Sequence, residues 1–448
     1  MRANWLSGLL RSTAGTLLLL ATITGAVLWF AIGMPTPAEI EGLARGHALI
    51  TTADEAVLAS VVGNGVHPTF EKYHRPNVDP DPSGVVIGGG GDQAEGIYFR
   101  FQLDPSMRYR LTMTGRTLTG TTTLRTRHDD ADALYHPPME GTDSLAFTGT
   151  TEYEVLLYFG PPSIYLLESI SVALCTDCRV DSDLRELISE SLPGLEEQVG
   201  DRTLQGARRI LDWVANAGDY ALSASIHERA NPRVARANAA GIYYEIFLPD
   251  AGGVYCGGYS IFLNKVFRLF GYDSFTINYG DLNDALTHVT VVVPVRQQTT
   301  ESESPSSWRF YFFDPTFNGT YVDPNSGDQL GVRRMLELIA NDAADGIRLE
   351  ELPVDRREFL AVPDEETRCP VIIERTDKLL ICEYPRFGID QYLADWEERL
   401  VRNGYSTGVG GLFELMLTRV FSVGPSPAFG ASEAFVTMLG EFGIPVGA

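Results

Sequence analysis

The sequence is poor in basic residues, and this shortage excludes one large class of partners. Only 35 of its 448 residues are lysine or arginine, against 59 aspartates and glutamates, so the formal net charge is −24. Because nucleic-acid binding needs a basic surface that pairs with phosphates, we expect no nucleic-acid partner. The hydrophobic content of 44% is that of a globular protein. The length allows two or three domains, each with its own core.

Cysteine is also scarce, and the five cysteines form no complete metal-binding pattern. Cys175 and Cys178 make one CxxC, but no second CxxC and no HxxxH accompanies it. A small loop disulfide therefore competes with half of a zinc site at this position. Cys369 and Cys382 flank two apolar runs that fit a hairpin, which would bring both thiols within disulfide reach. If both pairs form, Cys256 is the one unpaired cysteine, and it is either a reactive thiol or a buried inert one. We predict no metal site.

The N-terminal region predicts a membrane anchor. Residues 12–34 carry no charge and are numerous enough to cross a bilayer as a helix. Arg2 and Arg11 precede this segment and acidic residues follow it, so residues 1–11 should stay in the cytoplasm. A signal peptide with a small-residue cleavage site at 31–33 is the alternative. In both cases the rest of the chain is expected to be extracytoplasmic, on the periplasmic or outer face of the cell membrane.

Residues 35–96 have the composition of a stalk and a linker. Residues 35–62 predict a helical stalk, and residues 63–96 are rich in glycine, proline and aspartate. The glycine run at 88–91 lacks the Lys-Ser/Thr that a phosphate-binding loop needs. We therefore expect no nucleotide and no other cofactor.

Residues 97–178 predict an all-β sandwich of the jelly-roll kind. Short β-branched and aromatic runs recur at intervals of roughly 8 to 12 residues, separated by turn-forming residues. These runs are Ile97–Phe101, Tyr109–Met113, Thr121–Arg125, Glu152–Tyr158 and Ile164–Leu167. Small exported sandwiches often bind carbohydrate, so a glycan is a candidate partner here, although a fold alone does not establish a function.

The spacing of apolar residues along the sequence changes after residue 180. Apolar residues recur at steps of three and four over 181–230, which predicts two amphipathic helices separated at Pro193-Gly194. A further helix is predicted over 254–271, with Cys256 at its N-terminus. There the unpaired N–H groups and the helix dipole stabilise an anion. Glycines on both sides of Cys256 would leave its sulfur open to a substrate, or would merely fit a crowded helix entry.

Two later strands supply partners for this thiol. Residues 287–293 and 308–314 predict β-strands, and the polar loop 297–307 between them indicates a hairpin. Folding the chain back at this loop brings Val295 opposite about Ser307. His288 then lies opposite about Asp314, on the same face of the sheet. A carboxylate in that position would orient and charge-stabilise the imidazole.

A thiol, an imidazole and a carboxylate are what nucleophilic acyl chemistry requires. We therefore predict that Cys256 is the nucleophile, His288 the base and Asp314 the residue that orients the base. The order of these residues along the chain is that of papain-like cysteine enzymes.

The sequence around these residues resembles the transglutaminase-like superfamily. The resemblance covers about residues 240–318 and rests on Gly253–Tyr259, Leu269–Tyr272, His288-Val289 and Trp308 with Phe313–Thr316. It implies a papain-like α+β catalytic domain, which we expect at 181–360, followed by a C-terminal extension at 361–448. It also implies the catalytic triad Cys256, His288 and Asp314. The chain departs from the family in the residues after His288 and in a longer loop between the two strands.

The sequence thus predicts an exported, membrane-anchored, transglutaminase-like cysteine enzyme. It would act on amide bonds of a peptide, a protein or the cell envelope, through a thioester intermediate. Hydrolysis is favoured over transamidation because water needs no second binding site. The alternative is a non-catalytic envelope protein for binding or assembly, in which the β-sandwich holds a glycan or a protein.

Overall fold

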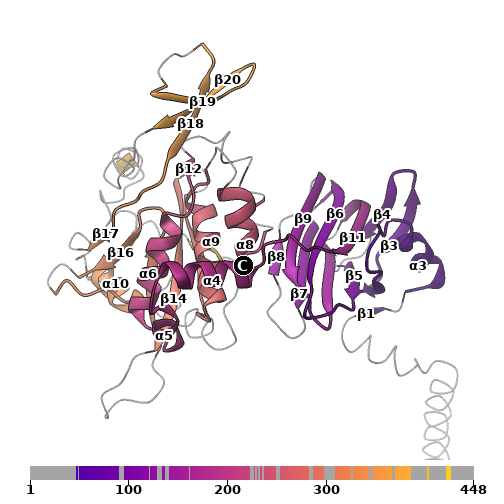
Figure 1. Cartoon of the computed structure of the whole chain (residues 1–448), viewed down its shortest axis with the longest axis horizontal. Coiled ribbons are helices and arrows are strands. Elements are labelled where there is room, and N and C mark those ends of the chain that lie inside the picture. Colours follow the sequence, from indigo (N-terminus) through magenta and orange to yellow (C-terminus); the bar gives the residue numbers. More distant parts are fainter. Residues whose placement is uncertain are drawn as a thin grey trace, which may run out of the picture.

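The computed structural model describes most of the chain between residues 47 and 384 and a short strand beyond. The described residues are 47–48, 50–89, 95–120, 122–128, 134–136, 141–160, 162–221, 227, 230, 233–234, 237–248, 253–281, 286–296, 308–323, 326–341, 343, 347–365, 369–384, 401–402 and 420–424. They form a β-sandwich followed by a part that mixes helices and strands (Figure 1). The predicted anchor at 12–34 lies outside the described residues. Within them, no helix has the length and apolar character to cross a membrane.

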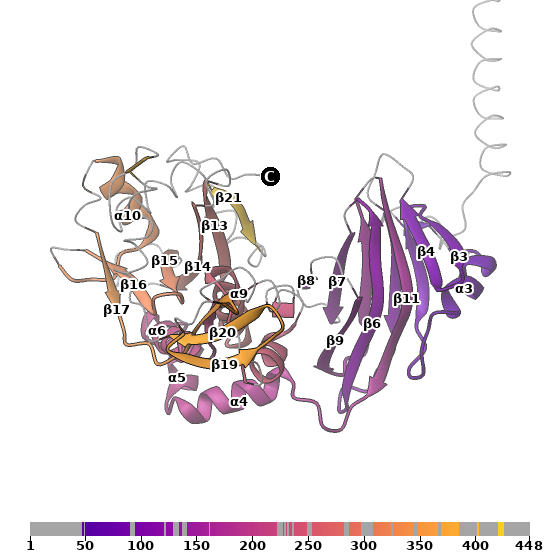
Figure 2. The same cartoon turned by 90° about the horizontal axis from the view of Figure 1, so that it is seen from above.

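The predicted β-sandwich is confirmed. A six-stranded antiparallel sheet has the order β1-β2-β5-β10-β7-β8. A five-stranded one has the order β3-β4-β11-β6-β9, which can be followed in Figure 2. The strands are β1 (His47–Ala48), β2 (Thr69–Tyr73), β3 (Asn77–Asp81), β4 (Gly84–Gly89), β5 (Glu95–Phe101), β6 (Arg108–Thr119), β7 (Thr122–His128), β8 (Leu134–His136), β9 (Gly141–Thr148), β10 (Tyr153–Phe159) and β11 (Ser163–Leu174). Alternate residues point inward. Ile97 and Phe99 of β5 thus meet Leu111 and Met113 of β6 in one buried core.

The sandwich begins earlier than the sequence predicts. The expected linker at 63–96 contains β2, β3 and β4, and α3 (Thr52–Ala59) buries Leu58 in the sandwich core. Glycine, proline and aspartate there serve an edge strand and tight turns. Pro80 is tolerated because β3 is the edge strand of its sheet. Asp81 accepts hydrogen bonds from the backbone and the hydroxyl of Ser83 in the β3–β4 turn. Turn-rich composition therefore does not separate a linker from short edge strands.

The second part of the chain is built on a six-stranded sheet with helices against both faces. The sheet order is β17-β16-β15-β14-β13-β21. Its strands are β13 (Phe275–Asp281), β14 (Leu286–Arg296), β15 (Trp308–Asp314), β16 (Gly319–Val322), β17 (Arg348–Glu351) and β21 (Val420–Gly424). The helices are α4 (Asp181–Ser191), α5 (Leu195–Gly200), α6 (Leu204–Ala215), α8 (Ala239–Gly241), the π-helix η1 (Ile242–Phe247), α9 (Cys256–Leu269) and α10 (Val332–Ala340). Val291 and Val293 of β14 pack with α4–α9, whereas Val292 packs with α10.

The helices follow the sequence prediction with one difference. The helix predicted over 254–271 is α9, and Gly271 takes a left-handed conformation with φ +81° just beyond its C-terminus. The sequence predicts two helices over 181–230, whereas the structure has three there, α4, α5 and α6. The break expected at Pro193-Gly194 separates α4 from α5, where Gly194 has φ +78°. The short α5 escapes the periodicity argument because a helix of six residues shows less than two turns of pattern.

Both predicted disulfides are present. Cys175 is bonded to Cys178, Cys369 is bonded to Cys382, and Cys256 is a free thiol. The second bridge joins the start of the β19–β20 hairpin to its far strand. This hairpin belongs to a small sheet of β12 (Tyr220–Ala221), β18 (Glu358–Pro363), β20 (Leu379–Tyr384) and β19 (Val371–Arg375), in that order.

The C-terminal region is not a separate extension. β18 spans the boundary expected at residue 361 and pairs with β12, whose Tyr220 forms a β-bridge with Val254, two residues before Cys256. β21 pairs with β13 at the edge of the large sheet. Residues of the region therefore complete sheets that begin far earlier in the chain.

Candidate active site

Cys256 is the first residue of α9, and the residue is partly exposed. The first turn of α9 holds no acidic side chain, and no side chain caps it. No carboxylate therefore competes with an anion on Cys256 for the N–H groups and the dipole of this helix end. The glycines beside Cys256 have a packing role as well. A Cβ on Gly253 would lie 2.3 Å from the carbonyl carbon of Tyr220, and one on Gly258 would lie 2.5 Å from Cβ of Val254.

His288 and Asp314 form a buried hydrogen-bonded pair. His288 Nε2 lies 2.7 Å from Asp314 Oδ2, and both side chains are fully buried. The structure thus brings together the two residues that the strand pattern predicted as neighbours. α9 packs against β14, which carries His288 (Figure 1).

The predicted register of the two strands was wrong by two residues. Val295 lies opposite Arg309 rather than Ser307, so β14 and β15 place His288 and Asp314 diagonally. A shift of two keeps every side chain on its face, and diagonal neighbours remain within reach of long side chains. The pair therefore forms in spite of the shift. A shift of one would have separated the two side chains.

The Asp314 carboxylate is held by three donors. Its Oδ2 accepts from His288 Nε2 and from the Tyr321 hydroxyl at 3.1 Å, and its Oδ1 accepts from the Thr316 backbone N–H at 3.0 Å. Because Nε2 is engaged with the carboxylate, Nδ1 is the ring nitrogen that can face Cys256. This arrangement orients the imidazole between an acceptor and a thiol.

The environment of His288 favours its charged form. Burial alone would lower the pKa of His288, but the Asp314 carboxylate and its hydrogen bond raise the pKa from 6.5 to about 10. The Cys256 side chain raises this pKa further. At neutral pH the site therefore holds an imidazolium, which is a proton donor for a leaving group.

Aromatic rings enclose the pair. Tyr279 and Phe317 each have ring centroids 5.7 Å from the His288 ring. Burial raises the pKa of Tyr279 well above its usual value, and Asp314 and Cys256 add to this effect. The pKa of Tyr220 is also raised well above its usual value, mainly by burial and additionally by Cys256. These side chains are therefore neutral walls that keep water from the imidazole.

Sequence reasoning missed several residues that support the site. Arg356 is buried and donates to the carbonyls of Ala215 and Thr316 and, at 3.2 Å, of Pro315. It thereby holds the turn that follows Asp314. Tyr321, which donates to Asp314, was also missed. Neither residue lies in a periodic pattern or motif, so no signal in the sequence marks them.

A second histidine lies beside the nucleophile. His227 Nδ1 accepts a hydrogen bond of 3.1 Å from the backbone N–H of Tyr255, and the two rings are stacked at 4.1 Å. The contact fixes the residue that precedes Cys256. His227 lies in no periodic pattern or motif, so no signal in the sequence points to it.

Among the described residues, one group has the composition of a metal site: Cys175, Asp177 and Cys178. Its two cysteines are joined by a disulfide, so they offer no thiolate ligands. The zinc alternative for this CxxC was therefore wrong.

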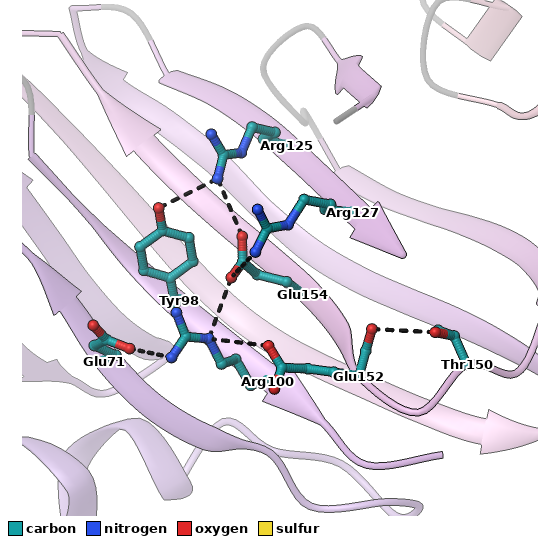
Figure 3. A network of polar contacts seen from close by, with 8 residues as sticks. All are labelled: Glu71, Tyr98, Arg100, Arg125, Arg127, Thr150, Glu152 and Glu154. Carbon is teal, nitrogen blue, oxygen red and sulfur yellow. Dashed lines mark hydrogen bonds and ion pairs between the residues drawn. The ribbon is translucent and has the colours of Figure 1, made fainter. Parts of the chain in front are cut away.

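The outward face of the six-stranded sandwich sheet carries an ordered network of charges (Figure 3). The Glu154 carboxylate is 3% exposed and contacts three guanidinium groups, those of Arg100 at 3.2 Å, Arg125 at 3.1 Å and Arg127 at 3.5 Å. The Arg100 and Arg125 guanidiniums also lie 5.1 and 5.8 Å from the centre of the Tyr98 ring. Arg100 also pairs with Glu71, so the network joins side chains of β2, β5, β7 and β10.

The comparisons with known proteins give no family. No family model matches the chain. No curated protein matches it either. Among solved structures, the active domain of tailspike protein 4 of bacteriophage CBA120 is similar with 13% identity and a TM-score of 0.19, over 24% of this chain and 18% of that chain. This chain thus spans less than a fifth of the tailspike domain.

Two further solved structures have similar scores. The secreted serine protease VesC from Vibrio cholerae is similar with 13% identity and a TM-score of 0.21, over 28% of each chain. A family 16 carbohydrate-binding module is similar with 13% identity and a TM-score of 0.18, over 25% of this chain and 99% of the module. TM-scores this low support no functional assignment.

Proposed function

We propose that this protein is an extracytoplasmic, membrane-anchored cysteine enzyme of the transglutaminase-like type that acts on amide bonds. One observation carries the proposal: a buried, hydrogen-bonded His288–Asp314 pair beside a free thiol at the N-terminus of α9. Four of the five cysteines are in disulfides, whereas Cys256 is free and partly exposed. A purely structural role for Cys256 does not explain why a charged imidazole is maintained next to it.

The proposed reaction has two steps. Cys256 Sγ, as the thiolate, attacks the carbonyl carbon of a carboxamide, and the carbonyl oxygen becomes an oxyanion that the backbone N–H of Cys256 stabilises. The His288 imidazolium then gives its proton to the departing amine, and a thioester remains on Cys256. In the second step His288, now neutral, takes a proton from water, and the resulting hydroxide attacks the thioester. The acid product leaves and the thiolate is restored.

The substrate class follows from the proposed location and chemistry. An anchored enzyme outside the cytoplasm meets peptides, proteins and cell-envelope amides. Hydrolysis is favoured over transamidation, because water needs no second binding site for an amine.

Acylation by a generic ester tests the proposal without knowledge of the substrate. p-Nitrophenyl acetate should acetylate Cys256 and release p-nitrophenolate, and mass spectrometry of the protein locates the acetyl group. We expect Cys256→Ala to abolish this acetylation and His288→Gln to slow it by roughly 100-fold or more. Acetylation of Cys256 at the same rate in His288→Gln would show that the pair does not activate the thiol.

A second candidate function, saccharide binding by the sandwich, rests on the network in Figure 3. The network offers fixed donors and acceptors on an outward sheet face, and Arg127 at its margin is 39% exposed. Rigid polar groups of both kinds suit the hydroxyls of a sugar, since they lose little entropy on binding. A glycan array probed with the full chain tests this. Arg127→Ala should lose the bound glycans, whereas Arg116→Ala, on the other sheet, should retain them. Equal retention by both variants would exclude this face.

A further inference from the structure

A cavity lies between the sandwich and the helical part, away from Cys256. Its volume is about 330 Å³, within the range of small-molecule sites, which are frequent at domain boundaries. One wall is the outward face of β6 and β9, with Arg110, Thr112 and Ser144. The other wall comes from η1 and the residues before it, with Arg233 and Glu245.

The lining of this cavity is positively charged on a strongly acidic protein. It holds two guanidinium groups, Arg110 and Arg233, and one carboxylate, Glu245. The chain as a whole has a formal net charge of −24. A local excess of positive charge in such a chain attracts and selects an anion.

Arg110 has hydrogen-bonding capacity to spare. Its Nη1 donates to Ser144 Oγ at 3.2 Å and to Glu245 Oε1 at 3.4 Å. Within the described part of the chain, its Nε and Nη2 make no hydrogen bond. These two nitrogens form the edge of a guanidinium that binds a carboxylate through two parallel hydrogen bonds.

Hydroxyl groups line the cavity next to this edge. Thr112 lies opposite Ser144 in the β6–β9 ladder, and its hydroxyl bonds no other described residue. Thr142 adds a third hydroxyl to the lining. A ligand that meets these groups gains most if it carries hydroxyls of its own, because each such group can donate and accept.

We propose that this cavity binds a sugar acid, a monosaccharide-sized ligand with one carboxylate and several hydroxyls. The carboxylate pairs with the free edge of Arg110, and the sugar hydroxyls meet Thr112, Thr142 and Ser144. The ligand touches both parts of the chain and therefore stabilises one mutual position of the sandwich and the helical part.

The wall formed by η1 is consistent with a binding role. π-Helices are rare and occur often at functional sites. The carbonyl of Glu245 in η1 accepts a hydrogen bond of 2.9 Å from Arg233. The same residue thus joins both guanidiniums, one through its side chain and the other through its backbone.

Calorimetric titration of the full chain with D-glucuronate tests the proposal, with D-glucose as the neutral analogue and the dipeptide Ala-Ala as a carboxylate without sugar hydroxyls. We expect glucuronate to bind at least about tenfold more tightly than either. Hydrogen exchange should slow in β9 and η1 when glucuronate is added. Absence of glucuronate binding, or binding of glucose or the dipeptide with equal affinity, overturns the proposal.

Three variants locate the site. Arg110→Gln should weaken glucuronate binding by about tenfold or more. Thr112→Val, which leaves every charge and the Arg108–Asp183 contact between the two parts in place, should weaken it by about threefold or more. Arg116→Gln, on the same face of β6 but outside the cavity lining, should bind as the wild type does. Unchanged affinity in both Arg110→Gln and Thr112→Val overturns the assignment. Cys256→Ala should bind normally, which separates this site from the proposed enzyme.

Discussion

Replacing Asp314 by asparagine tests the electrostatics on which the proposed site depends. Burial lowers the pKa of His288, yet the Asp314 carboxylate raises it from 6.5 to about 10. The folded protein thus binds this proton more tightly than the unfolded chain does. The pair therefore stabilises the fold fully below pH 6.5, and this contribution is lost as the pH rises to about 10. The full difference in pKa corresponds to roughly 5 kcal/mol as an upper bound.

Asp314→Asn keeps the size and one acceptor oxygen but removes the charge. At pH 7 the buried imidazolium then has no counter-charge, and we expect a loss of about 3 to 5 kcal/mol in the free energy of unfolding. At pH 10 and above, where the wild-type imidazole loses its proton, the loss should fall to about 1 kcal/mol. The loss of stability caused by this variant should therefore shrink as the pH rises.

Urea unfolding at both pH values, followed by tryptophan fluorescence, measures this difference. Trp213 packs against Tyr243 and Phe262 and so reports on the helical part that carries the site. The comparison of two proteins at each pH cancels other titrations, such as that of Lys265, whose pKa burial lowers to about 8. Tyr321→Phe is the matched control: it removes one neutral donor from Asp314 and should cost about 1 kcal/mol at both pH values. An equal loss for Asp314→Asn at pH 7 and pH 10 would refute the reasoning.

Two further substitutions test the packing around the site. Gly253→Ala would bring a Cβ to 2.3 Å from the Tyr220 carbonyl carbon, so we expect a loss of about 1 to 3 kcal/mol in thermal unfolding and slower acetylation of Cys256. Gly200→Ala, whose Cβ would meet nothing within 4 Å, should change stability by less than about 0.5 kcal/mol; equal effects would contradict the packing argument. Arg356→Lys cannot supply the planar set of donors that three carbonyls accept, and we expect a loss of about 2 to 4 kcal/mol in urea unfolding. A loss below about 1 kcal/mol would show that water replaces the guanidinium.

The sequence predicted the elements with strong local patterns. Five sandwich strands, β5, β6, β7, β10 and β11, have strong apolar and β-branched patterns, and α9 has a regular apolar face with a glycine stop, so these elements were recognised. The strands β2, β3 and β4 were not, because their turn-rich composition is also that of a linker. The prediction that His288 and Asp314 lie on the same face of the sheet was right, because side chains alternate between the two faces along a strand. The register was wrong by two because the length of a polar loop does not determine where pairing begins.

The contacts that depend on distant parts of the chain could not be predicted. β21 joins β13 across more than a hundred residues, and β12 has only two residues, too few to show a period. Arg356 and Tyr321 act through single hydrogen bonds to a turn and a carboxylate. Such contacts have no spacing that a sequence pattern could reveal.

The most direct test of the central claim is the rate at which iodoacetamide alkylates Cys256 at pH 7. Cys256 is the free thiol among five cysteines, so the labelled site is unambiguous. We predict that the folded wild type reacts at least about tenfold faster than the urea-unfolded protein, because the proposed reaction requires an activated thiol at the N-terminus of α9 beside His288. His288→Gln should lose this advantage. A folded wild-type protein that reacts no faster than the unfolded chain, or no faster than His288→Gln, would contradict the account.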